Sequence, residues 1–257
     1  MDYQPMLETA LRAAREAGAM AKASSGKPLY QQWKAGRDLV VGSTLPIQQR
    51  IIEIIRTDFP NHAILAEESD APPPADSNPL WIVDPIDGSM NFLQGIPHVA
   101  ISIAYREDGF CRVGVVYDPF TDELFQAVQG RFARLNDHSI TVQQISEGED
   151  ATIQAIVATD LPAGMKERQQ NLNIATLMAV HCTALTIMGS PALGLCYVAA
   201  GRLHGYFGLD LKLWDVAAAS VILSESKYPD DPWRLHSRRL RPHRTAIAHC
   251  SCARIPG

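Results

Sequence analysis

The sequence predicts an α/β (α+β) protein, built as a layered sandwich of helices and sheets. Two amphipathic helix patterns come first, a run of short strands follows, and helices then alternate with strands. This order is typical of sheets that are covered by helices. A polar stretch at residues 146–150 is the expected boundary between an N-terminal α+β domain, residues 1–145, and a C-terminal α/β domain, residues 146–257.

The expected N-terminal domain opens with two helices and closes with an antiparallel meander. Apolar residues recur at helical spacing over residues 5–23 and 47–59, and the polar segment 27–37 between them favours a loop. Short apolar runs bounded by Gly, Pro or Asp predict strands over residues 63–66, 80–83, 99–105, 113–117, 124–128 and 132–135.

Strands and helices alternate in the expected C-terminal domain, and its apolar runs are again short. Such alternation is typical of a sheet with helices on its faces. Strands are expected over residues 153–158, near Leu185 and near Tyr206, and helices over residues 169–180, 192–200 and 216–224.

Composition and charge exclude several classes of protein. Of 257 residues, 46% are hydrophobic and 20% are charged, which is ordinary globular usage and argues against disorder. The formal net charge of −5 offers no bulk attraction for nucleic acid. No apolar run approaches the ~20 residues of a membrane-spanning helix, and the acidic N-terminus does not resemble a signal peptide. We therefore expect no nucleic-acid partner and no membrane.

The five cysteines are scattered along the chain. They predict reduced thiols in a cytoplasmic protein rather than a disulfide framework. Cys250 and Cys252, with His243 and His249 near them, could be read as a metal cluster. Their spacing is unlike that of zinc-binding cysteine pairs, so a frayed tail is the favoured interpretation.

The most informative segment is residues 81–92, in which an apolar strand delivers Asp84 and Asp87 into a turn. Gly88 permits a sharp turn and a close backbone approach to a ligand, and a helix that begins near Ser89 would direct its free amides at an anion. Hard oxygen ligands beside such a turn suit Mg²⁺ that holds a phosphate. The alternative is an ordinary Asp-Pro turn that caps a helix.

Two further acidic positions strengthen the metal interpretation. Glu67 also ends an apolar strand, and Asp215 stands at the start of an apolar helix. Asp215 has an ordinary alternative, because Asp is a favoured helix N-cap. Aspartates at the end of a buried strand repel each other unless a cation lies between them. Together Glu67, Asp84, Asp87 and Asp215 form a candidate set of ligands.

The acidic motifs of the inositol monophosphatase family resemble, in the same order, three segments of this chain: Glu67-Glu68-Ser69, Asp84-Pro85-Ile86-Asp87-Gly88-Ser89-Met90-Asn91-Phe92 and Trp214-Asp215-Val216-Ala217-Ala218. The resemblance runs from the first helix to about residue 237. It implies the layered αβαβα sandwich of the Mg²⁺-dependent, lithium-sensitive sugar phosphatases. It also implies a cofactor of two or three Mg²⁺ ions and a homodimer.

The resemblance further implies roles for individual residues. Glu67 with Ser89 would activate the attacking water. The metal ligands would be Glu67, Asp84, the Ile86 carbonyl, Asp87 and Asp215. The substrate would lie against Asp87, Gly88, Ser89, Gly189, Ser190, Pro191 and Asp215.

The expected function is that of a Mg²⁺-dependent phosphomonoesterase acting on a small polyol or sugar phosphate by direct water attack. Inositol phosphate is the first choice of substrate by resemblance. Histidinol phosphate, fructose 1,6-bisphosphate and a nucleotide 3′-phosphate are alternatives within the superfamily. An alternative of another class is a non-catalytic descendant that binds phosphorylated ligands or a protein partner.

Several positions depart from the family pattern. Thr44 stands where an Asp would orient the active-site hydroxyl, and Thr186 stands where the family has Arg. Gly208 stands where animal members carry a Glu that contacts inositol, so a larger or differently shaped alcohol is expected to fit above it. The tail from residue 238 matches the family poorly.

Overall fold

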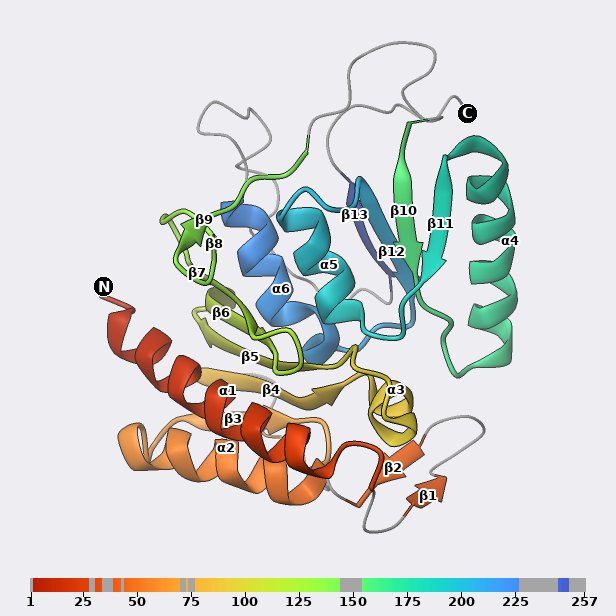
Figure 1. Cartoon of the computed structure of the whole chain (residues 1–257). Coiled ribbons are helices and arrows are strands. Elements are labelled where there is room, and N and C mark those ends of the chain that lie inside the picture. The colour runs from red at the N-terminus through yellow and green to blue at the C-terminus, as the bar shows by residue number, and fades with distance from the viewer. Residues whose placement is uncertain are drawn as a thin grey trace.

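The computed structural model describes residues 2–27, 31–33, 39–42, 44–69, 73, 77–143, 154–226 and 245–249. Figure 1 shows five layers, which are a helix pair, a seven-stranded sheet, a second helix pair, a four-stranded sheet and an outer helix. The predicted layered αβαβα sandwich is therefore confirmed.

Helices cover both faces of the large sheet. α1 (Gln4–Ser24) and α2 (Thr44–Asp58) pack on one face, and α5 (Pro191–Ala199) and α6 (Leu213–Glu225) pack on the other (Figure 1). α4 (Met165–His181) packs on the small sheet from outside. Within the described ranges, none of the helices is both long and apolar enough to cross a membrane.

The strands form two main sheets and one separate pair. In spatial order, the large sheet contains β3 (Ala63–Ala66), β4 (Leu80–Asp87), β5 (Ala100–Glu107), β6 (Phe110–Asp118), β7 (Glu123–Val128), β8 (Arg134–Leu135) and β9 (His138–Ser139). The small sheet contains β11 (Ala184–Ile187), β10 (Ile156–Thr159), β12 (Gly205–Leu209) and β13 (Thr245–His249). The pair is β1 (Gln31–Trp33) with β2 (Leu39–Val41).

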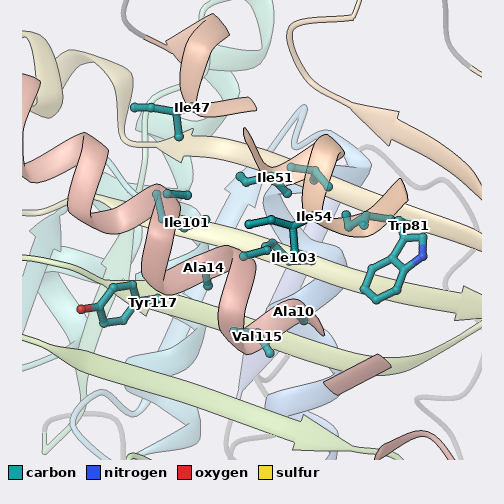
Figure 2. Close-up of a cluster of buried hydrophobic side chains, with 14 of the residues drawn as sticks. Ala10, Ala14, Ile47, Ile51, Ile54, Trp81, Ile101, Ile103, Val115 and Tyr117 are labelled. Atoms are coloured by element: carbon teal, nitrogen blue, oxygen red, sulfur yellow. The ribbon is translucent and has the colours of Figure 1, made fainter. Parts of the chain in front are cut away.

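The first hydrophobic core lies between the α1–α2 pair and the large sheet (Figure 2). Ala10 and Ala14 of α1 are completely buried, and their small side chains let the helix backbone approach the sheet closely. Ile51 of α2 and Ile101 and Ile103 of β5 fill the space between the layers. This burial explains why the helical spacing of apolar residues predicted both helices.

The second hydrophobic core joins the two halves of the chain. Leu80 and Phe125 of the large sheet lie in one cluster with Leu193 of α5, Ala218 of α6 and Tyr206 of β12. The α5–α6 layer therefore packs on both sheets and holds them together. The expected domain boundary at residues 146–150 lies outside the described residues, so the division into two domains stays a prediction.

Most expected elements are present with shifted ends, and β2, β9 and β13 lie where no element was predicted. β1 lies in the segment predicted as a loop. Its pairing with β2 is made by backbone groups, so the surrounding polar sequence carries no apolar alternation that would indicate a strand. β4 continues beyond residue 83 to Asp87, and α4 begins at Met165 rather than near residue 169. Cys250 and Cys252 lie outside the described residues.

Gly114 of β6 sets how closely α6 approaches the large sheet. A Cβ atom at this position would lie 2.2 Å from the carbonyl oxygen of Ala218. Gly114→Ala is therefore expected to lower the free energy of unfolding by about 1–3 kcal/mol, measured by urea titration. Gly164→Ala is the control, because its Cβ would meet only the end of the flexible Glu167 side chain. Equal stability losses in the two variants would contradict this account.

Candidate metal centre

A bulge in β4 places Asp84 and Asp87 on one face of the large sheet. Side chains alternate along a strand, so residues three apart normally face opposite sides. Asp84 pairs with Ser102 and Asp87 with Ala100, which means that β4 carries one extra residue between these two pairs. The bulge therefore turns both carboxylates toward the α5–α6 layer, as bulges beside active sites often do.

The register of β3 brings Glu67 beside Asp84. β3 runs parallel to β4 with Ala66 opposite Val83, and the backbone N–H of Glu67 donates to the carbonyl of Val83 at 3.1 Å. Glu67, the first residue after β3, therefore lies beside Asp84 of β4. Burial and the charges of Glu67, Asp87 and Asp215 raise the pKa of Asp84 well above its ordinary value.

Asp87 is held by the start of α5. Its Oδ2 accepts the hydroxyl of Ser190 and the backbone N–H of Ala192, the latter at 2.8 Å. Burial, and then the charge of Asp215, raises the pKa of Asp87, although these two hydrogen bonds oppose the shift. Ser190 is completely buried. The structure thus shows Ser190, which was expected beside the substrate, supporting Asp87.

Asp215 lies in the first turn of α6. Its Oδ2 accepts the backbone N–H of Lys212 at 2.7 Å, so part of its role is to cap the helix, from a position inside the first turn. The hydroxyl of Ser102 donates to the carbonyl of Trp214 at 3.2 Å and ties this turn to β5. Burial raises the pKa of Asp215 to about 7, against the opposing hydrogen bond from Lys212.

The turn after β4 also matches the expectation. Gly88 has a φ of 99°, and its Cβ would lie 3.0 Å from the carbonyl oxygen of Gly189. α3 (Ser89–Gln94) begins at the next residue. The hydroxyl of Ser89 donates to the carbonyl of Ile86 at 3.2 Å. Gly88 is therefore needed for its backbone angle and for the close approach of another part of the chain.

The four carboxylates act on one another, and their chemistry suits a hard cation. Among the described residues, no group of three or more Asp, Glu, His or Cys side chains is placed so that it could hold a metal ion by itself. Mg²⁺ usually keeps several waters and takes one or two carboxylates from the protein, so it does not need a complete cage. Asp84 and Asp87 are buried, and Glu67 and Asp215 add their charge at Asp84, so a cation that neutralises these acids would stabilise the fold. The chemistry of these carboxylates, completed by waters, fits Mg²⁺.

Two departures from the family pattern have clear structural outcomes. Thr44 begins α2, and its hydroxyl donates to Glu68 at 2.9 Å. The space directly beside Gly208 is occupied, so the room expected there is not free, whereas which alcohol the site fits stays a prediction. A Cβ on Gly208 would lie 2.9 Å from Leu211 Cδ1 and 3.1 Å from the hydroxyl oxygen of Tyr206. Leu211 and Tyr206 fill the space.

The sequence interpretation missed Asp160, a buried acid that follows β10 directly. Its Oδ1 accepts the backbone N–H groups of Met188 and Gly189, and its Oδ2 accepts the hydroxyl of Tyr206. Burial raises the pKa of Asp160 to about 6 against these hydrogen bonds. The signal was available, since an acid at the end of an apolar strand had already singled out Glu67.

Comparison with known proteins decides the family. The model of the inositol monophosphatase family matches residues 2–226. The chain belongs to the inositol monophosphatase family. A Nus factor SuhB of Pasteurella multocida is 40% identical over 229 residues, covering 86% of this chain and 83% of the relative. Its name does not agree with the expectation that nucleic acid plays no part.

Solved structures of this family share the fold. The extragenic suppressor protein suhB of Bartonella henselae superposes with a TM-score of 0.78 at 32% identity, covering 85% of this chain and 84% of that one. The inositol monophosphatase of Anabaena superposes with a TM-score of 0.76 at 31% identity, covering 88% and 83%. The names of these relatives thus differ: the Anabaena protein is called a phosphatase, and the two SuhB proteins are called a Nus factor and a suppressor protein.

Proposed function

We propose that this member of the inositol monophosphatase family is a Mg²⁺-dependent phosphomonoesterase that hydrolyses a small polyol or sugar phosphate. One observation carries the proposal: the bulge in β4 turns the buried Asp84 and Asp87 to one face, where the charges of Glu67 and Asp215 add to theirs. Such a cluster costs stability unless a ligand neutralises it. The family and its Anabaena phosphatase support the same reaction.

In this proposal Glu67, Asp84, the Ile86 carbonyl, Asp87 and Asp215 hold two or three Mg²⁺ ions. When bound, these ions would neutralise charge on the phosphoryl group and make a water molecule a better nucleophile. Water would attack phosphorus as the bond from phosphorus to the alcohol oxygen breaks. The attacking water would give up one proton, and the leaving alkoxide would take one from solvent.

Residues at the edge of the site act on the water and on the substrate. Glu67 is partly exposed at the end of β3, where it can accept a proton from the attacking water. Ser89 would assist from the turn after β4. The amides of Gly88 and Ser89 would bind phosphate oxygens, and Gly189 and Pro191 would lie beside the leaving alcohol.

The direct experiment is a phosphate-release panel with Mg²⁺. It contains inositol 1-phosphate, histidinol phosphate, fructose 1,6-bisphosphate and a nucleotide 3′-phosphate, and the expected result is turnover of at least one. Inhibition by lithium is measured in the same assay, and light scattering tests the homodimer. If none of these esters is hydrolysed, the proposal fails.

Catalysis is expected to depend on the hydroxyl group at position 89 and not on whether a serine or a threonine carries it. Ser89→Ala should lower kcat/KM by about 10–100-fold, the usual cost of losing a group that supports metal ligands. Ser89→Thr keeps the hydroxyl and should stay within about threefold of the parent. Steady-state kinetics with saturating Mg²⁺ measure both variants. An alanine variant as active as the parent would remove Ser89 from the mechanism.

A second candidate function is a role as a Nus factor, which the name of the 40% identical relative favours. Such a role implies contact with the transcription machinery and nucleic acid. A gel-shift assay with a reconstituted transcription complex tests it. Binding that survives Asp87→Asn would support a role separate from hydrolysis, and no binding by the parent would contradict it.

A further inference from the structure

The turn between β11 and α5, residues 188–190, is held on two sides. The backbone N–H groups of Met188 and Gly189 donate to Asp160 Oδ1, the first of them at 3.2 Å. The carbonyl of Met188 accepts Asn91 Nδ2 at 3.0 Å, which ties the turn to α3. The position of the turn is therefore set by hydrogen bonds to the carboxylate of Asp160 and the side-chain amide of Asn91.

Asp160 is itself fixed. Its other oxygen, Oδ2, accepts the hydroxyl of Tyr206 at 2.9 Å, and both side chains are buried. Tyr206 lies on β12, which pairs with β10 next to Asp160. The carboxylate of Asp160 is thus held on the small sheet. The N–H groups of Met188 and Gly189, which donate to it, are held there as well.

Residues 188–190 in addition support Asp87. Ser190, the next residue after Gly189, donates its hydroxyl to Asp87 Oδ2, and the N–H of Ala192 donates to the same oxygen. The turn also lies against the one after β4, since a Cβ on Gly88 would lie 3.0 Å from the carbonyl oxygen of Gly189. A shift of residues 188–190 would therefore move the support of Asp87.

We infer that Asp160 is a positioning residue, which with Tyr206 fixes the 188–190 turn and so orients Asp87 from the opposite sheet. The inference rests on the proposed function of Asp87 as a metal ligand. Hydrogen-bond acceptance is what matters, because Asp160 meets both the turn and Tyr206 through hydrogen bonds that its two oxygens accept. An asparagine can accept the same two N–H groups through Oδ1 and donate to the Tyr206 oxygen through its amide.

The test compares Asp160→Asn with Asp160→Ala. The asparagine variant should keep kcat/KM within about threefold, and the alanine variant should lose about 10–100-fold, as when a group that orients a metal ligand is removed. The alanine variant should also need more Mg²⁺ for half-maximal rate. A second readout without turnover is the rise in melting temperature that Mg²⁺ causes, which should shrink in Asp160→Ala and persist in Asp160→Asn.

Asp118→Ala is the matched control. Asp118 is also buried, and its Oδ1 accepts two backbone N–H groups, those of Phe120 at 2.8 Å and Thr121 at 3.3 Å. Its loss should lower the melting temperature and leave the response to Mg²⁺ unchanged. Equal losses in both Asp160 variants would show that the charge acts and would overturn the inference. A loss of stability alone in Asp160→Ala, with an unchanged Mg²⁺ response, would overturn it too.

The inference and the proposed function fail in different ways. A parent that hydrolyses none of the panel esters would remove the phosphatase proposal, whereas the Mg²⁺-induced change in melting temperature would still test Asp160. A parent that is active together with a fully active Asp160→Ala variant would leave the phosphatase proposal standing and remove the role of Asp160.

Discussion

Replacing Asp87 by Asn is expected to lower kcat/KM for phosphate release by more than about 100-fold while the fold is kept. Asp87 Oδ2 accepts both Ser190 and Ala192, so the amide oxygen of an asparagine would stay with these two donors. The NH₂ group, which carries no lone pair for a cation, would then occupy the place of Oδ1. Losing a ligand should cost more than the ~10–100-fold that its supporting groups cost.

The measurement is steady-state phosphate release over a range of Mg²⁺ concentrations, with circular dichroism as the check of folding. Asp58→Asn is the control substitution, because Asp58 accepts Thr9 and Arg12 between α1 and α2, on the other side of the large sheet. It should leave the rate unchanged. If Asp87→Asn released phosphate as fast as the parent, catalysis would not depend on the acidic cluster.

The layers of this fold were predictable where burial is one-sided. The buried face of α1 repeats every three or four residues, as at Ala10 and Ala14, so the sequence pattern reports the packing directly. The pattern is weak for α4, where only Asn171 and Ala175 are buried, and it placed the start of this helix four residues too late. It is silent for β1, whose pairing is made by backbone groups.

The acids of the site were predictable as a set, and their arrangement was not. Acidic residues at the ends of apolar elements singled out Glu67 and Asp87. The bulge that turns Asp84 and Asp87 to one face depends on the register with β5, which the composition of β4 does not reveal. The support of Asp87 by Ser190 joins residues 103 positions apart, so local sequence could not show it.

The filled space at Gly208 shows the same limit. A glycine suggests room when it is compared with a larger residue at the same place. The structure fills that room from within the fold, with Leu211 three residues further on and with Tyr206 two residues before. Packing of near neighbours in a strand and its following turn is decided by the backbone path, which sequence spacing alone does not define.

Asp84→Asn is expected to raise the melting temperature of the Mg²⁺-free protein. A carboxyl whose pKa is raised on folding is harder to ionise in the folded state, so its charge destabilises the fold at pH values above its ordinary pKa. Each unit of such a shift corresponds to about 1.4 kcal/mol, and 1 kcal/mol moves the melting temperature of a protein of this size by about 2–4 °C. The asparagine removes the charge and keeps the shape.

Differential scanning fluorimetry at neutral pH, with and without Mg²⁺, measures the effect. Mg²⁺ should raise the melting temperature of the parent clearly and that of Asp84→Asn much less, because the variant has lost both a ligand and the repulsion that the cation relieves. Asp58→Asn should change the melting temperature of the Mg²⁺-free protein in the opposite direction. Hydrogen bonds from Thr9 and Arg12 lower the pKa of Asp58, so its carboxylate stabilises the fold and its loss should lower the melting temperature. A Mg²⁺ response of Asp84→Asn equal to that of the parent would mean that Asp84 holds no cation. A lower melting temperature of this variant without Mg²⁺ would contradict the repulsion, because its Oδ1 can still accept the N–H of Ile86.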